Sequence, residues 1–296
     1  MQVHAIHTGT VQIHQRQRSG SGRGVLRFAN TLLDSHWTEP LPILAWLIEH
    51  PEGLILVDTG ETARTGEAGY FPPWHPYYRW ALREQVRPDE EIGPRLHQLG
   101  FAIDDVRWVV LTHLHTDHAG GLSHFPNSEI LLSRAEYEVA KGFIGKLRGY
   151  LPHRWPEWFA PRLIDFATER VGPFPASFPL TRAGDVQIVP TPGHSAGHMS
   201  VVVSEGERVL FIAGDTSYSE ANLVAGILDG VASLGGGLAA AARALERIRA
   251  YARDRALVYL PSHDPESEAR LRSRQTVTIS EPHESIDPEI TPRGPR

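Results

Sequence analysis

Four side chains that can bind a metal ion occur within six residues of the sequence. They are His113, His115, Asp117 and His118. The segment follows the apolar run 106–111, which reads as a buried strand. His113 and His115 are two residues apart, so both imidazoles point the same way in an extended chain. Imidazole and carboxylate ligands together favour Zn, Fe, Co or Mn over Ca or Mg, and the segment therefore predicts a metal site at the end of this strand.

Further candidate ligands follow other predicted strands. They are His194, Asp215 and His263, and each lies just beyond the carboxyl end of an apolar run. One cluster of four side chains cannot complete the ligand shells of two metal ions. Because several strand ends can converge on one rim, we expect all seven side chains to share one site.

The composition restricts the class of protein. The 296 residues include 29 Lys and Arg and 35 Asp and Glu, and the net charge of −6 opposes broad binding to nucleic-acid phosphates. The absence of cysteine excludes disulfides, thiolate ligands and a cysteine nucleophile. The N-terminus lacks a secretory-signal pattern, and the longest apolar stretch, 41–48, is far shorter than the ~20 residues of a membrane-spanning helix. We therefore expect a soluble, cytoplasmic protein with no nucleic-acid or membrane partner.

Short apolar or alternating runs predict β-strands. They cover residues 2–6, 41–49, 53–58, 105–111, 128–132, 186–190, 200–204, 208–213 and 257–260. Helical patterns cover 89–100, 133–142 and 237–255. Strands that cluster between helices predict an α/β domain, here residues 1–277, with helices on the outer faces of its sheets. The segment 14–24 reads as a flexible loop, and 278–296 reads as an extended or disordered tail.

The order and spacing of these ligands resemble the metallo-β-lactamase superfamily, from about residue 40 to 275. The resemblance implies an αββα sandwich, in which two mixed β-sheets are flanked by helices and carry a two-metal site at one edge. By this resemblance metal 1 is held by His113, His115 and His194, metal 2 is held by Asp117, His118 and His263, and Asp215 bridges the two. The implied cofactors are two divalent metal ions, Zn first and Co, Mn or Fe as alternatives. Such a pair lowers the pKa of a shared water from about 15.7 to about 7, so a bridging hydroxide is the expected nucleophile.

Particular residues separate the branches of this superfamily. Antibiotic-cleaving members usually lack the bridging aspartate, whereas this chain has Asp215, and redox di-iron members carry glutamate at the position of His115. Tyr218 is similar to the tyrosine with which N-acyl-homoserine lactonases bind the lactone carbonyl, and the residues around His263 also resemble that branch. The resemblance implies a quorum-quenching lactonase in which Asp117, Asp215 and Tyr218 take part in catalysis. Asp215 would carry a proton to the leaving oxygen.

Three further side chains are expected to support the site. The resemblance suggests that Asp58, at a strand end, accepts a hydrogen bond from a ligand histidine and fixes its orientation. His198 reads as a supporting or core histidine. Asp264 either orients the adjacent His263 or faces solvent.

Two aromatic segments, 70–80 and 150–159, lie outside the predicted strands. Each can form an apolar wall of a substrate pocket or a contact in a homodimer, where Trp and Tyr are enriched. The expected partner is a small lactone or ester substrate, and the homodimer is implied by the resemblance alone.

Two alternative functions remain open. The first is another hydrolase of the same fold, acting on a thioester, as glyoxalase II does, or on a phosphotriester. A glutathione thioester would need basic groups for its carboxylates, and the chain offers Arg255, Arg270, Arg272 and Arg274. The second is a binding module without turnover, which would normally lack one or more of the seven ligands that are all present here.

Overall fold

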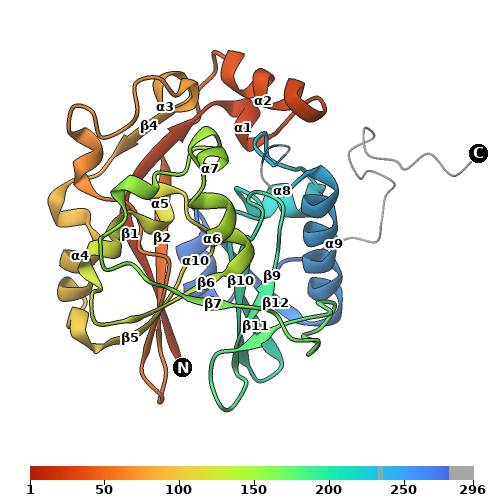
Figure 1. Ribbon diagram of the computed structural model, residues 1–296. Coiled ribbons are helices and arrows are strands. Elements are labelled where there is room, and N and C mark those ends of the chain that lie inside the picture. The colour runs from red at the N-terminus through yellow and green to blue at the C-terminus, as the bar shows by residue number, and fades with distance from the viewer. Residues whose placement is uncertain (233, 235, 280–296) are drawn as a thin grey trace, which may run out of the picture.

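The computed structural model describes residues 1–232, 234 and 236–279. Two β-sheets lie against each other, with helices on their outer sides (Figure 1). Of the tail predicted for 278–296, Ile279 packs against the core, and residues 280–296 lie outside the described part of the chain.

Within the described residues, the larger sheet has seven strands in the order β4-β1-β2-β3-β5-β6-β7. Their bounds are β1 Gln2–Ile13, β2 Leu41–Glu49, β3 Leu54–Val57, β4 Leu82–Gln85, β5 Val106–Val110, β6 Glu129–Ser133 and β7 Arg162–Ile164. β1 pairs antiparallel with β2 and β4, whereas β5 pairs in parallel with both β3 and β6. The sheet is therefore mixed.

In the same part of the chain, the smaller sheet has five strands in the order β12-β11-β10-β9-β8. Their bounds are β8 Phe178–Pro179, β9 Val186–Pro190, β10 Met199–Glu205, β11 Arg208–Gly214 and β12 Ala256–Pro261. Only the β11–β12 pair among these strands is parallel. In this arrangement β9, β11 and β12 can all direct the residues that follow them toward the site.

The helices differ widely in length. Their bounds are α1 Gln15–Arg18, α2 Gly24–Leu33, α3 Pro76–Trp80, α4 Ile92–Gln98, α5 Thr116–Ala119, α6 Arg134–Ala140, α7 Phe143–Leu147, α8 Glu220–Ala225, α9 Leu238–Asp254 and α10 Ser267–Ser273. Among the described residues, no helix combines the length and apolar character needed to cross a membrane.

The apolar side chains form layers that establish the αββα sandwich. β2 is buried along nearly its whole length because both of its faces are covered. Trp46 joins the cluster between the two sheets, whereas Leu47 points to the opposite face and packs with Leu96 of α4, as the two-residue period of a strand requires. Ile248 of α9 covers the outer face of the smaller sheet. The fold class expected from the sequence is confirmed.

The main correction to the expected elements concerns the segment 14–24. Part of it is helical, as α1, and Gln17 is 2% exposed. The run of Gln, Arg, Ser and Gly suggests solvent exposure, but the backbone carbonyl of Gln17 accepts a hydrogen bond from Gly230 N–H, 2.8 Å away. A contact across more than 200 residues fixes this segment, and local composition carries no sign of it.

Candidate metal centre

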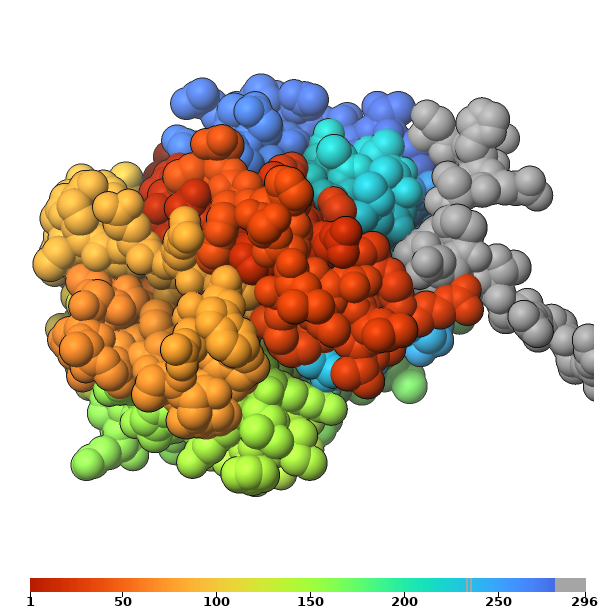
Figure 2. Space-filling view, turned by 90° about the horizontal axis from the view of Figure 1, so that it is seen from above, coloured from red at the N-terminus to blue at the C-terminus, as the bar shows by residue number. Residues whose placement is uncertain are grey.

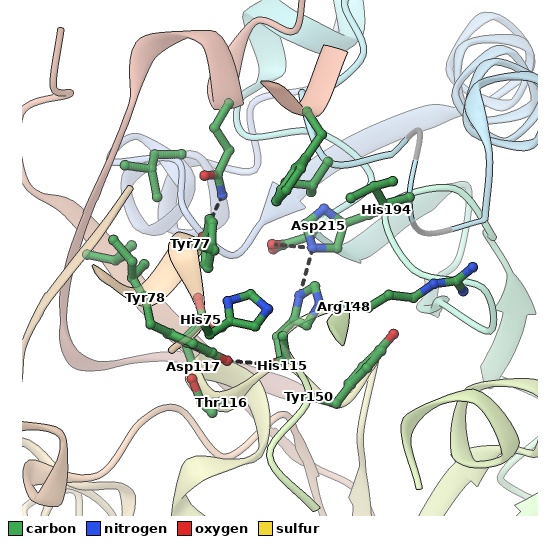
Figure 3. A pocket seen from close by; sticks show the side chains of 18 of the residues that line it. His75, Tyr77, Tyr78, His115, Thr116, Asp117, Arg148, Tyr150, His194 and Asp215 are labelled. Carbon is green, nitrogen blue, oxygen red and sulfur yellow. Dashed lines mark hydrogen bonds and ion pairs between the residues drawn. The ribbon is translucent and has the colours of Figure 1, made fainter. Parts of the chain in front are cut away.

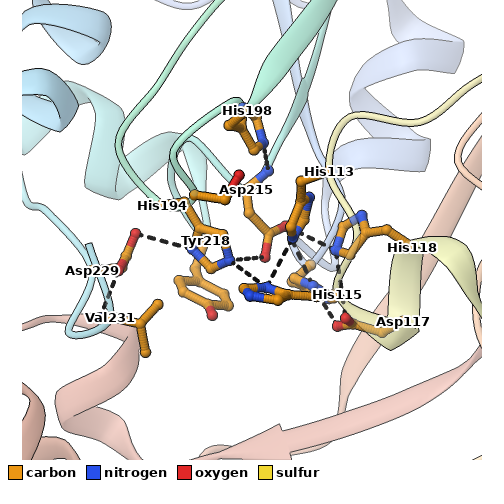
Figure 4. Close-up of polar contacts among 12 residues, drawn as sticks. His113, His115, Asp117, His118, His194, His198, Asp215, Tyr218, Asp229 and Val231 are labelled. Atoms are coloured by element: carbon orange, nitrogen blue, oxygen red, sulfur yellow. Dashed lines mark hydrogen bonds and ion pairs between the residues drawn. The ribbon is translucent and has the colours of Figure 1, made fainter. Parts of the chain in front are cut away.

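The seven candidate ligands occupy the positions expected from strand ends. His113 and His115 follow β5, Asp117 and His118 belong to the short helix α5, and the other three follow β9, β11 and β12. Figure 4 shows the labelled histidines and aspartates directed toward one another from these separate elements. The convergence expected from the sequence is therefore present in the structure.

The loop that carries Asp215 shows how the backbone places a ligand. β11 ends at Gly214, whose φ of +56° lies in the left-handed region that glycine adopts readily. A Cβ atom there would stand 2.6 Å from Nε2 of His198. The backbone N–H of Asp215 donates to that same nitrogen over 3.0 Å. His198 is thus a buried supporting histidine, as expected.

Three histidines form a first group of candidate ligands, namely His113, His115 and His194. Nε2 of His113 and Nε2 of His194 each lie 3.0 Å from Nδ1 of His115. One potential ligand atom from each residue lies within 4.8 Å of the others. This is a compact set of nitrogen donors suited to one transition-metal ion.

A second group consists of Asp117, His118 and His263. Nε2 of His263 lies 3.3 Å from Oδ2 of Asp117, and Nε2 of His118 lies 3.8 Å from Oδ1 of the same carboxylate. The second group therefore mixes nitrogen and oxygen donors.

Asp215 lies between the two groups. Its Oδ2 is 3.4 Å from Nε2 of His194 in the first group. Its Oδ1 is 3.4 Å from Nε2 of both His118 and His263 in the second group. One carboxylate oxygen thus faces each group, which is the arrangement that a bridging ligand requires.

Two atoms of this cluster lack a hydrogen bond although they are buried. Nε2 of His118 and Oδ1 of Asp215 make none with the described residues, and both side chains are almost fully shielded from solvent. Unpaired polar atoms are costly inside a protein. The nitrogen and oxygen donor set, and these two atoms that face each other over 3.4 Å without a hydrogen bond, fit divalent metal ions bound at this site.

Burial keeps part of the cluster neutral without metal. It lowers the pKa of His113 well below the usual range, and the neighbouring imidazoles lower it further. Burial likewise lowers the pKa of His115 to about 3. Neutral imidazole is the form that binds a metal ion, so these two histidines are ready to act as ligands at neutral pH.

The other three candidate ligand histidines have raised pKa values. Burial disfavours the charged form of His263, but Asp215 and Asp117 outweigh burial and raise its pKa to about 10. Asp215 is also the main cause of the raised pKa of His118 and His194, again against burial. In the metal-free site, imidazolium charges therefore balance the carboxylates, and metal binding must displace those protons.

Three of the candidate ligand histidines are oriented by their other ring nitrogen. Nδ1 of His118 lies 2.8 Å from Oδ2 of Asp58, Nδ1 of His194 lies 3.3 Å from Oδ2 of Asp229, and Nδ1 of His263 lies 2.8 Å from the carbonyl oxygen of Pro42. The expected contact of Asp58 with a candidate ligand histidine is therefore present. Asp229 follows no predicted strand, so its contact with His194 could be found only in the folded chain.

Replacement of Asp58 by asparagine is expected to weaken metal binding about 10–100-fold, because carboxylates that orient ligand histidines contribute on that scale. Oδ1 of Asp58 also accepts from the backbone N–H of Thr112 over 2.7 Å. Asparagine tolerates the left-handed backbone at this position, where φ is +61°. Competition with a chromogenic chelator measures the effect, and an unchanged metal affinity would contradict the assignment.

The expected role of Asp264 is wrong. Its carboxylate accepts from the backbone N–H of Glu220 over 3.0 Å and pairs with Arg270 over 3.0 Å, and among the described residues it makes no hydrogen bond or ion pair with His263. It is only 4% exposed, so the solvent-facing alternative is also wrong. His263 and Asp264 lie in the turn after β12, and the fold brings Arg270 and the backbone N–H of Glu220 to Asp264.

Glu136 is a supporting residue that sequence reasoning missed. It is fully buried in α6 and accepts hydrogen bonds from Leu114 N–H at 3.2 Å, Ser195 Oγ at 2.7 Å and Gly197 N–H at 2.9 Å. One carboxylate thus joins the loop of His113 and His115 to the loop of His194. In the sequence, Glu136 reads as an ordinary polar residue of a helix.

A cavity lies against the cluster. His75, Tyr77 and Tyr78 from one aromatic segment and Tyr150 from the other line it, and Figure 3 shows the first three across the cavity from His194. These four residues therefore form part of a pocket wall, which is the first of the two roles expected for the aromatic segments. Trp74, in contrast, is 58% exposed.

Comparison with known proteins identifies the family. A profile of the Metallo-beta-lactamase superfamily matches residues 38–263, and the chain therefore belongs to this superfamily. A probable metallo-hydrolase of Mycobacterium tuberculosis is 35% identical over 187 residues, covering 60% of this chain and 57% of the relative. An N-acyl homoserine lactonase of Bacillus cereus is 30% identical over 191 residues, covering 62% and 66%. The matches thus span less than two thirds of either relative.

Solved structures agree with the fold. An N-acyl homoserine lactone hydrolase, with the product N-hexanoyl-L-homoserine bound at its catalytic metal center, aligns with a TM-score of 0.69. The alignment covers 90% of this chain and 94% of that chain at 22% identity. A structure described as the hydrolase AbOPH in the beta lactamase superfamily aligns with a TM-score of 0.58 at 17% identity. At these identities the likeness establishes the fold alone.

Proposed function

We propose that this protein is a metal-dependent hydrolase that opens the lactone ring of N-acyl homoserine lactones. The observation that carries the proposal is the position of Asp215, which offers one oxygen to each group of histidines while the Tyr218 side chain lines the same cavity. The 30% identity to lactonases supports the choice of substrate class.

Each group of ligands would hold one divalent ion. His113, His115 and His194 would bind the first, Asp117, His118 and His263 would bind the second, and Asp215 would contact both. When bound, such ions supply an activated water and polarise a carbonyl group. Asp215 is ionised and can therefore act as a ligand. His263 and His118 hold its pKa well below the usual range, although burial opposes this.

Tyr218 is placed to bind the carbonyl oxygen of the lactone. Its ring stacks on His263, with ring centroids 5.6 Å apart. Its hydroxyl oxygen accepts a hydrogen bond from Gln17 Nε2 over 2.9 Å. The phenolic hydrogen has no acceptor among the described residues, so it can be donated to an oxyanion in the cavity.

Asp117 and Asp215 both line the cavity, and both are ionised at neutral pH because the nearby imidazoles lower their pKa values. A carboxylate beside the reacting ester can receive a proton and pass it to the leaving oxygen. We assign that transfer to Asp215, whereas Asp117 would hold the second ion beside it together with His118 and His263.

Acid release from a medium-chain N-acyl homoserine lactone tests the function directly, because each ring opening yields a carboxylic acid. The metal-loaded protein is expected to acidify a weakly buffered indicator solution, and a chelator should stop the reaction. A loaded enzyme that releases no acid would remove the lactone from the proposal and direct the search to thioesters and phosphotriesters.

Three of the four arginines considered for a glutathione thioester make contacts with other groups of the protein. Arg270 pairs with Asp264, Arg274 pairs with Glu205, and Arg255 donates to backbone carbonyls. Neither these three residues nor Arg272 line the cavity beside the metal ligands. The thioester alternative therefore receives no support from these residues.

Replacement of Tyr218 by phenylalanine is expected to lower kcat about 10–100-fold, less than the loss of a metal ligand, because it removes one of several groups that stabilise the oxyanion. Metal content should stay unchanged, since the hydroxyl is not a ligand in the proposed site. Initial rates with a saturating lactone measure kcat. A wild-type rate in this variant would return Tyr218 to a packing role.

A further inference from the structure

Gln17, which lines the cavity, has a buried hydrogen-bond acceptor without a partner. Its side-chain oxygen Oε1 is buried and has no hydrogen-bond partner among the described residues, and Gln17 is one of the residues that line the cavity beside Asp215 and Tyr218. A buried acceptor without a partner is unfavourable. A ligand that brings a donor to this atom would relieve that penalty.

The amide nitrogen of Gln17 is fully used. Nε2 donates to the hydroxyl oxygen of Tyr77 and to that of Tyr218, each over 2.9 Å. The two hydrogens of the amide group are thereby assigned, one to each phenol. Since both phenols accept from Gln17, each must direct its own hydrogen elsewhere, and neither has another partner among the described residues.

The three side chains come from distant parts of the chain and are held in place. Gln17 lies in α1, Tyr77 lies in α3, and Tyr218 follows β11. The backbone carbonyl of Gln17 is fixed by Gly230 N–H over 2.8 Å. Figure 2 shows the segments of α1 and α3 next to each other on one face of the molecule, and Figure 3 shows Tyr77 in the cavity wall.

The resulting set of polar groups consists of one acceptor, Gln17 Oε1, and two donors, the hydroxyls of Tyr77 and Tyr218. The lactone carbonyl needs only the donor assigned above, Tyr218. The remaining acceptor and donor match a secondary amide, whose N–H donates and whose carbonyl accepts. An ester or lactone without an amide would bury Gln17 Oε1 unpaired.

We propose that Gln17 and Tyr77 bind the acyl amide of the substrate, so that the enzyme selects lactones carrying a secondary amide beside the ring over lactones with a plain alkyl substituent. The inference rests on the proposed lactonase function and extends it to substrate selection. Gln17 has a second effect, since it also fixes the orientation of the Tyr218 phenol.

Two substrates of equal length test this selection. One is N-octanoyl homoserine lactone, and the other is a γ-butyrolactone whose α-alkyl chain replaces the amide by methylene groups. The wild-type enzyme is expected to prefer the amide by at least about tenfold in kcat/KM, the order of one hydrogen bond made against an acceptor left unpaired. In Gln17→Leu this preference should fall toward one, with the loss seen mainly in KM for the amide substrate.

Three controls separate the outcomes. Gln15→Leu changes an exposed glutamine of the same helix and should keep the wild-type preference. Tyr218→Phe should slow both substrates by the same factor, because both contain the lactone carbonyl, and so should leave the ratio intact. Tyr77→Phe should lower the ratio as Gln17→Leu does, and it provides a second test if Gln17→Leu does not fold.

Several results would overturn the inference. A wild-type enzyme that hydrolyses both lactones with equal kcat/KM has no amide selection. An equal fall for both substrates in Gln17→Leu would show that Gln17 acts only by holding the phenols. A wild-type enzyme that binds metal but hydrolyses neither lactone would instead refute the lactonase function, and the amide site would fall with it.

Discussion

Replacement of Asp215 by asparagine is expected to lower kcat/KM by more than about 10³-fold, beyond the 10–100-fold typical of residues that only orient a ligand. The amide keeps the size of the side chain but removes its negative charge and replaces one oxygen by NH₂. The NH₂ group cannot bind the metal ion that would be held by the histidines it faces. Metal content by atomic absorption should fall together with the rate of lactone opening.

The matched control for this change is Asp254→Asn. Asp254 is exposed at the end of α9, so the same loss of charge occurs far from the cluster, and both metal content and rate should match the wild type. Full activity of Asp215→Asn with normal metal content would refute the bridging role. A normal metal content with a large loss of rate would leave Asp215 as the proton carrier alone.

Removal of metal by a chelator is expected to abolish turnover and to lower the unfolding temperature. A ligand that binds only the folded state stabilises it by about 2.7 kcal/mol at a concentration 100 times its Kd. Chelation removes this contribution and leaves buried polar atoms without a hydrogen bond in the cluster, among them Oδ1 of Asp215. Thermal unfolding with and without chelator, followed by restoration with Zn, Co or Mn, measures both effects.

Metal binding should also release protons, with a sign that follows from the pKa shifts. His263, with a pKa of about 10, and His118 and His194, whose pKa values are raised, are protonated in the metal-free protein at pH 6. Each must lose its proton to become a ligand. Metal affinity should therefore increase from pH 6 toward pH 9.

Calorimetry at pH 6 in buffers of different ionisation enthalpy is expected to detect the release of about three protons per protein molecule from these imidazoles. His113 and His115 should add none, because burial already keeps them neutral. A metal affinity that does not change with pH, or activity that survives complete removal of metal, would refute the proposed centre.

The sequence by itself indicated nine of the twelve strands that the described residues form, the α/β class and the clustering of candidate ligands, whereas β4, β7 and β8 were not predicted. β2 and β5 are recognisable because both faces of each strand are buried, which produces nearly continuous apolar runs. The ligands are recognisable because His113 and His115 directly follow such a run, and polar residues at strand ends converge at the edge of a sheet. These signals depend on neighbours in the sequence.

Only the tertiary structure decided which residues complete the site. Gln17 reaches Tyr218 across 201 positions, and Asp229 reaches His194 across 35. Asp264 lies beside His263 in the sequence but pairs with Arg270. Such partners are selected by the packing of loops around the cavity, because a buried donor or acceptor takes whichever group the fold brings near it. Local sequence patterns carry no record of that choice.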